Sequence, residues 1–168
     1  FGYQKLPINL ISVGSSYDYS KLGCSHHCYD DVSLLKHFKR SNIFVPGSSF
    51  EFRKMLFNNY SKDKINYFRL TEFQNSIRVN NSNGIICKSG SDLTIAVLGN
   101  KLDLAINACN DLKKLKIDPE IVYFNQLAPF NSLNLFKSVK KTKKLLCIEE
   151  LSETGGLYED CLKSLNGI

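Results

Sequence analysis

Residues 93–115 read LTIAVLGNKLDLAINACNDLKKL, and this stretch decides the fold class. Apolar and β-branched residues from Leu93 to Leu98 predict a buried strand that ends at Gly99. From Lys101 the apolar residues follow the period of an amphipathic helix. Its apolar face consists of Leu102, Ala105, Ile106, Cys109 and Leu112. A buried strand that leads directly into such a helix is typical of a parallel sheet covered by helices.

The same alternation of strands and helices repeats along the rest of the chain. Upstream, strands are predicted at 7–13, 43–45 and 65–70, and helices at 30–38 and 48–60. Downstream, strands are predicted at 121–124 and 145–148, and helices at 131–141 and from 156 to 165. We therefore expect an α/β protein with two small three-layer domains and mainly parallel sheets. The first domain would be incomplete, because few helices are available to cover its strands.

Between the two halves the sequence becomes polar. Asn80, Asn81, Asn83 and Gly84 belong to the residue types that favour turns and loops. We predict a first domain at 1–75, a linker at 76–91 and a second domain at 92–168.

The composition is that of a globular protein. Hydrophobic residues make up 43% and charged residues 23% of the chain, and no apolar run approaches the ~20 residues that cross a bilayer. The net charge of +6 raises the question of nucleic-acid binding. However, the densest lysine cluster, at 137–144, lies where a surface helix should end, and cations are favourable there. Because zinc-finger and RNA-binding aromatic motifs are also missing, we expect no nucleic-acid partner and no membrane partner.

The cysteines bear on the cellular compartment. They are Cys24, Cys28, Cys87, Cys109, Cys147 and Cys161. Cys109 and Cys147 lie in apolar helix and strand patterns, as small buried side chains do. A chain of this length does not need disulfides to fold. We therefore expect reduced cysteines and a cytoplasmic protein.

The segment 23–31, GCSHHCYDD, concentrates reactive side chains in a loop just before a helix. A metal site would use Cys24, His26, His27 and Cys28 as ligands. Ligands that are almost consecutive do not easily surround one ion, so no metal is expected. A cysteine nucleophile with a histidine base is a second interpretation. The third is a surface loop whose aspartates only cap the following helix.

Several short motifs follow one another in an informative order. They are GYQKLP at 2–7, the loop at 23–31, VPGS at 45–48 with Glu51, SDLTI at 91–95 with Gly99, LAPFN at 127–131, and CIEE at 147–150 followed by GGL at 155–157. Each motif is weak alone, but in this order they resemble the transketolase family. That family includes deoxyxylulose-phosphate synthase and the beta subunits of 2-oxo acid dehydrogenases. The resemblance covers nearly the whole chain, as the second half of the pyrimidine-binding domain and the C-terminal domain.

The resemblance implies chemistry based on thiamine diphosphate and magnesium. The cofactor forms a carbanion, attacks a ketose or 2-oxo acid carbonyl and passes a two-carbon unit to an acceptor. By the same resemblance, His26 is the catalytic histidine near the oxygens of the donor. Ser25, His27 and Arg69 are substrate-binding candidates. The remaining residues, Glu149, Glu150, Gly155 and Gly156, are expected to be structural, and His37 to lie on the surface.

The chain departs from the family pattern in three respects. The pyrimidine-activating glutamate, its aromatic neighbours and the diphosphate- and magnesium-binding domain are not in this sequence, so the cofactor would be held mainly by missing residues or a partner chain. Leu22-Gly23 replaces an Asp-Gly pair that contacts a donor hydroxyl in many members. Glu72 stands where a phosphate-binding arginine is expected, and it would repel a phosphate unless Arg69 or Arg40 substitutes.

We therefore expect part of, or a subunit of, a transketolase-like enzyme that transfers a two-carbon unit between sugar-type substrates. The chain would be truncated at both ends and inactive alone. Its site would be completed by a homodimer partner or by a separate subunit with the diphosphate-binding domain. One alternative is a beta-type subunit of a 2-oxo acid dehydrogenase. Another is a non-catalytic assembly or regulatory subunit that kept the fold.

Overall fold

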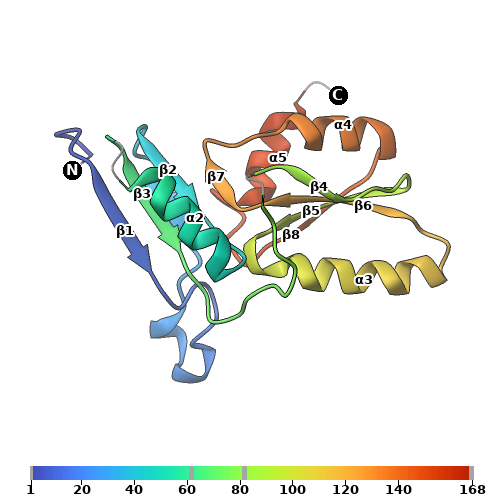
Figure 1. Cartoon of the computed structure of the whole chain (residues 1–168), viewed down its shortest axis with the longest axis horizontal. Coiled ribbons are helices and arrows are strands. Elements are labelled where there is room, and N and C mark those ends of the chain that lie inside the picture. Colours follow the sequence, from blue (N-terminus) through green and yellow to red (C-terminus); the bar gives the residue numbers. More distant parts are fainter. Residues whose placement is uncertain (1, 61–62, 81–82, 167–168) are drawn as a thin grey trace.

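The computed structural model describes residues 2–60, 63–80 and 83–166 and contains two four-stranded sheets with helices packed on them (Figure 1). The sheets follow one another along the long axis of the molecule. Most strand pairs within them are parallel, which confirms the predicted α/β class. Among the described residues, no helix has the length and apolar character needed to cross a bilayer.

The first sheet has the strand order β1-β3-β2-β7. Its strands are β1 (Ile8–Ser12), β2 (Ser41–Phe44), β3 (Ile65–Arg69) and β7 (Gln126–Ala128). The pairs β1–β3 and β2–β3 are parallel, as the alternating pattern predicts. By contrast, β7 pairs antiparallel with β2 and belongs to the C-terminal half of the sequence. The first sheet is therefore completed by a strand from the second half, which joins the two halves directly.

Two helices cover opposite faces of the first sheet. On one face, α2 (Ser49–Asn59) places Met55 against Phe44 and Phe68. On the other, α1 (Asp31–Lys36) buries Val32 in a cluster with Ile43 and Tyr67. Because successive residues of a strand point to opposite faces, neighbours such as Ile43 and Phe44 serve different helices.

The second sheet has the strand order β4-β6-β5-β8. Its strands are β4 (Ile85–Lys88), β5 (Leu93–Leu98), β6 (Pro119–Phe124) and β8 (Leu145–Ile148). Strand β5 is parallel to β6 and β8, whereas β4 is antiparallel to β6. Since β4 lies within residues 76–91, that stretch is not only a linker, and the second sheet begins before residue 92.

The second sheet is sandwiched between helices. Its helices are α3 (Leu102–Lys114), α4 (Leu133–Thr142) and α5 (Leu157–Leu165). On one face, Leu102, Ala105 and Cys109 of α3 pack with Ile95 and Val97. On the other face, Leu135, Leu157 and Cys161 of α4 and α5 pack with Ala96 and Leu98. Both faces of β5 are buried, which is why its sequence is a continuous apolar run rather than an alternating one.

The carboxyl ends of the parallel strands in the two sheets face one another (Figure 1). After β2, the Val45 N–H donates to the carbonyl oxygen of Asn125, which follows β6, at 2.8 Å. After β5, the carbonyl of Gly99 accepts a hydrogen bond of 2.9 Å from the Asn75 side chain. Ligands of open α/β sheets bind outside the carboxyl ends of strands, so this junction is the place to look for a site.

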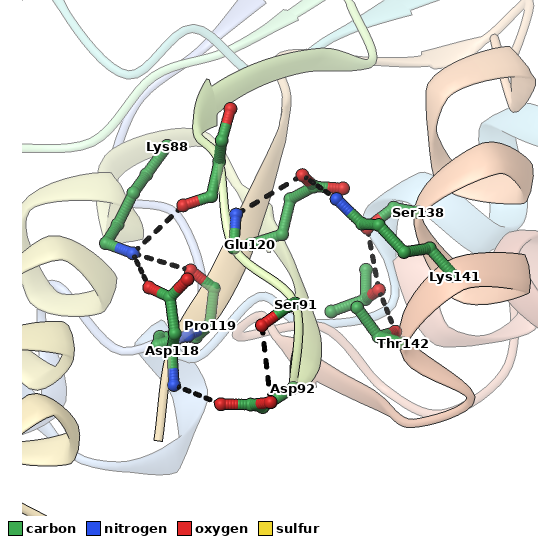
Figure 2. A network of polar contacts seen from close by, with 12 residues as sticks. Lys88, Ser91, Asp92, Asp118, Pro119, Glu120, Ser138, Lys141 and Thr142 are labelled. Carbon is green, nitrogen blue, oxygen red and sulfur yellow. Dashed lines mark hydrogen bonds and ion pairs between the residues drawn. The ribbon is translucent and has the colours of Figure 1, made fainter. Parts of the chain in front are cut away.

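The opposite, amino edge of the second sheet is closed by polar contacts within the chain (Figure 2). Glu120 accepts a 2.5 Å bond from Lys141 and a 3.4 Å bond from the Gly90 N–H. Lys88 forms a 2.8 Å ion pair with Asp118. These contacts fasten loops to strands and leave the carboxyl edge as the candidate functional edge.

Candidate functional site

The candidate residues lie on the segment that connects β1 to α1, residues 14–30, here called the histidine loop. It leaves the strand at Gly14, whose φ of 78° is unfavourable for residues with a side chain. A Cβ atom there would also lie 2.2 Å from the ring of Tyr19. The loop then forms two short 3₁₀ turns, Ser20–Leu22 and Cys24–His26. The sequence thus turns sharply out of the sheet and presents its histidines beyond the strand end.

His26 is exposed at the end of the second 3₁₀ turn. Its Nδ1 atom lies 3.1 Å from the hydroxyl oxygen of Ser25. Because that contact engages Nδ1, Nε2 is the ring nitrogen available to an incoming oxygen atom. Ser25 and His26, which are adjacent in sequence, are thus also in side-chain contact, and their predicted roles toward a substrate stay predictions.

His27 turns toward the interior of the loop. Its ring meets the Tyr17 ring edge-on, with centroids 5.1 Å apart, and Tyr17 stacks on Tyr29. The Nε2 atom of His27 is buried and has no hydrogen-bond partner among the described residues. Buried polar atoms normally have a partner, so a water molecule or a ligand atom would satisfy this nitrogen.

Arg69, the third predicted substrate-binding residue, has a different environment. Its side chain is only 4% exposed and forms an ion pair with Asp31 at 2.8 Å. Its Nη2 group donates to the hydroxyl of Ser16 and to the carbonyl oxygen of Cys28. The Arg69 guanidinium thus binds groups within the chain beneath the histidine loop, and its predicted contact with substrate stays a prediction. Arg40, the other possible substitute, pairs with Asp63 at 2.7 Å near the start of β3, away from the carboxyl edge.

The neighbouring strand end is acidic. Asp18 of the histidine loop accepts hydrogen bonds of 2.9 Å from the Thr71 hydroxyl and the Glu72 N–H. Glu72 itself is exposed. Two carboxylates therefore lie where the sequence pattern led us to consider a phosphate-binding residue.

The cysteine chemistry considered from sequence is not favoured at Cys28. Burial, followed by the negative charge of Asp31, raises the pKa of the Cys28 thiol. The nucleophilic form of cysteine is the thiolate, which a raised pKa makes scarcer at neutral pH.

In the described part of the chain, no group of three or more His, Cys, Asp or Glu side chains is arranged to hold a metal ion.

The Glu-Glu and Gly-Gly motifs have a structural role. Glu149 accepts hydrogen bonds from the N–H groups of Leu157 at 2.6 Å and Tyr158 at 2.7 Å, and so caps the start of α5. Burial outweighs these two bonds and raises the pKa of the Glu149 carboxyl. Glu150 pairs with Lys101 at 2.5 Å. These contacts agree with the structural role predicted for both glutamates.

Sequence reasoning missed the residues that support the histidine loop. Ser16 carries no recognisable motif, and Tyr67 is indistinguishable from an ordinary apolar strand residue. Asp31 is read only as a favourable charge in the first turn of a helix. The available signal was a charged arginine at the end of an otherwise uncharged strand, since a buried charge requires a partner.

Comparison with known proteins identifies the family. Residues 83–167 match the family described as "Transketolase, C-terminal domain". The chain belongs to the transketolase family. It is 23% identical to a subunit of the apulose-4-phosphate transketolase of Actinobacillus succinogenes, over 92% of this chain and 52% of that protein. It is also 32% identical to the beta subunit of the pyruvate dehydrogenase E1 component of Cyanidium caldarium, over 48% of this chain and 25% of that protein.

Solved structures extend the comparison to nearly the full chain. A structure described as "Split gene transketolase, inactive beta4 tetramer" superposes with a TM-score of 0.77 and 25% identity, covering 96% of this chain and 54% of that one. These relatives match nearly all of the present chain. The chain, however, spans only about half of their length. The relatives that match are subunits of transketolases and of pyruvate dehydrogenase E1, enzymes of a family that depends on thiamine diphosphate.

Proposed function

We propose that this chain forms part of a thiamine-diphosphate-dependent transferase that passes a two-carbon unit between sugar-type substrates. Thiamine diphosphate and magnesium would be held mainly by residues missing from this sequence or by a partner chain. When bound, the cofactor supplies the electron sink for the carbanion chemistry. This chain supplies the histidine loop and the C-terminal domain behind it.

The observation that carries the proposal is the placement of His26. It is exposed beyond the carboxyl end of β1 and its Nδ1 contacts the Ser25 hydroxyl. An imidazole held in this way donates a hydrogen bond to a hydroxyl or carbonyl oxygen of a donor, or transfers a proton to it. His27, with its unpartnered buried nitrogen, is a second contact for a hydroxyl group.

The charges near the loop favour a hydroxyl-bearing group over a phosphate at this position. Asp18 and Glu72 lie at the neighbouring strand end, and Arg69 is engaged by Asp31. A phosphate there would meet like charges, and the Arg69 guanidinium would not be free to bind it.

The free thiols of all six cysteines fit the proposal that the enzyme works in the cytoplasm.

Two other functions have specific support. The identity with pyruvate dehydrogenase E1 beta subunits favours a subunit that acts on a 2-oxo acid. The alternative of a non-catalytic subunit draws on the solved relative described as an inactive beta4 tetramer, because that description reports an assembly of beta chains without activity.

The test compares two histidine variants of the full-length protein, purified with its partner subunit and supplied with thiamine diphosphate and magnesium. His26→Ala should lower kcat for ketose-to-aldose transfer by about 10²–10⁴-fold, the usual contribution of a general acid or base. His37→Ala is the matched control, because His37 is exposed and its Nδ1 atom lies 2.9 Å from the Ser33 carbonyl oxygen in the preceding helix. Equal activity of the two variants would refute the role of His26.

The same preparation separates the other functions. Turnover of a 2-oxo acid in place of a ketose would identify the dehydrogenase-type function. No turnover of either donor, together with no binding of thiamine diphosphate to the assembled protein, would identify an assembly subunit.

A further inference from the structure

Arg69 lies at the end of β3, directly beneath the two ends of the histidine loop. The loop is closed at its base by Ser16 and Cys28, which exchange two backbone hydrogen bonds of 2.9 Å. The Arg69 Nη2 group donates to both sides of this closure, to the Ser16 hydroxyl at 2.8 Å and the Cys28 carbonyl at 2.6 Å. One guanidinium thus ties both ends of the loop to the sheet.

Asp31 fixes the orientation of this guanidinium from the other side. Its two carboxylate oxygens accept from Arg69 Nε at 3.1 and 2.8 Å. One of them also accepts from the Tyr67 hydroxyl at 2.5 Å, and that hydroxyl lies 2.6 Å from the Ser12 hydroxyl. The network therefore links β1, β3 and the first turn of α1 around the base of the loop.

Burial makes this ion pair hard to replace. The Arg69 and Asp31 side chains are 4% and 11% exposed. Neither side chain is open to a ligand, and removing either partner would strand a charge away from water. A lysine would keep the positive charge at position 69 but would not supply the planar, forked set of donors that reaches three groups at once.

We propose that Arg69 and Asp31 are positioning residues that set the place of His26 and His27 above the strand ends without touching substrate. This inference deepens the proposed function and rests on it for its effect on activity. Its structural half, the order of the loop, is independent of that function. It also gives the buried arginine a role other than phosphate recognition.

The test measures loop order and catalysis in the same full-length protein with its partner. Arg69→Lys should raise hydrogen–deuterium exchange within residues 17–27 while leaving exchange in β5 and β6 unchanged. It should lower kcat by about 10–100-fold with little change in KM, because a displacement of the order of 1 Å at the site has that effect on rate. Arg40→Lys is the matched control, since Arg40 forms an exposed ion pair with Asp63 and should alter neither quantity.

A milder variant covers the possibility that Arg69→Lys fails to fold. Ser16→Ala removes one of the groups that Arg69 holds and should give an intermediate rise in exchange of the loop. Unchanged exchange in residues 17–27 of either folded variant would overturn the inference. A rise in KM for a phosphorylated substrate, with unchanged exchange, would show that Arg69 binds phosphate after all.

The outcomes also separate this inference from the proposed function. If His26→Ala retains full activity while Arg69→Lys loosens the loop, the catalytic role of His26 fails and the positioning of the loop stands. If His26→Ala is inactive while Arg69→Lys leaves the loop and kcat unchanged, the catalytic role of His26 stands and the positioning role of Arg69 fails.

Discussion

Glu51 is a buried carboxylate that connects the two halves of the molecule. It lies on α2 and is 2% exposed. Its Oε2 atom accepts hydrogen bonds from the Tyr123 hydroxyl at 2.8 Å and from the Asn125 side chain at 2.7 Å, both from the second half. Burial, followed by the charge of Glu51, raises the pKa of Tyr123, which keeps its hydroxyl a proton donor. We predict that the junction depends on this acceptor.

Replacing Glu51 by alanine would leave its two closest buried donors, the Tyr123 hydroxyl and the Asn125 amide, without this acceptor. It would also remove the longer contacts from the Gly47 N–H at 3.4 Å and the Ser48 hydroxyl at 3.5 Å. Each unsatisfied buried group costs about 1–3 kcal/mol, so the loss of the two closest bonds in Glu51→Ala should lower the free energy of unfolding by about 2–6 kcal/mol. Tyr123→Phe removes a single bond to a charged acceptor and should cost about 1.5–3 kcal/mol. In the double variant, of the two closest donors only Asn125 remains, without its acceptor. The double variant should therefore lose less unfolding free energy than the sum of the two single variants, by at least about 1 kcal/mol.

These differences are measured by urea unfolding of the full-length protein, monitored by far-ultraviolet circular dichroism. The comparison requires that the slope of the unfolding free energy against urea concentration is the same in all variants. Additive losses, within about 0.5 kcal/mol, would show that Glu51 and Tyr123 do not interact energetically. A loss below about 1 kcal/mol for Glu51→Ala would refute the reasoning altogether.

Three further predictions concern other capping and buried groups. Gly156→Ala would place a Cβ atom 2.5 Å from the Glu149 carboxylate, displace this cap from α5 and cost about 2–3 kcal/mol, measured by urea unfolding; a loss below about 0.5 kcal/mol would contradict this. Ser48→Ala should cost about 1 kcal/mol in the same assay, because the Ser48 hydroxyl accepts the Glu51 N–H at the start of α2; an effect below about 0.3 kcal/mol would contradict this. Burial alone would raise the pKa of Glu120, but bonds from Lys141, Ser138 and the Gly90 N–H outweigh it and lower that pKa. The charged form therefore stabilises the fold above the usual glutamate pKa of 4.5, and this stability is lost as the pH falls through the lowered value. Glu120→Gln should therefore melt at a lower temperature than the unsubstituted protein, and this difference should shrink as the pH falls from the usual glutamate pKa through the lowered value. A difference that stays constant with pH would contradict the prediction.

Much of the fold follows from local patterns. The run from Leu93 to Leu98 and the helix after it are predicted almost residue for residue, because a strand buried on both faces and an amphipathic helix each leave a periodic signal. Strands β4 and β7 escape prediction for a physical reason. They are four and three residues long, and each is stabilised by pairing with a strand distant in sequence rather than by its own pattern.

The candidate site divides in the same way. The position of His26 in a loop before a helix is visible in the sequence, since Gly, Ser and Asp mark the loop and its end. The role of Arg69 is not visible, because it depends on Asp31, which lies 38 residues away, and on the carbonyl of Cys28. From the sequence alone, Arg69 is interpreted as a possible ligand for a phosphate group. In the structure it is buried, and a buried arginine requires a carboxylate partner within the chain.

The C-terminal domain also has a direct physical connection to the histidine loop. The Ser16 hydroxyl at the base of the loop donates to the carbonyl oxygen of Glu150, and the Ser152 N–H donates to the carbonyl of Tyr29 at 3.1 Å. Glu150 and Ser152 follow β8, so the loop is held by the strands of the first sheet and by the strand end of the second. Because the same Ser16 hydroxyl meets Arg69 and Glu150, a shift of one sheet against the other would move the loop that carries His26. The two halves therefore act on the candidate site as one unit.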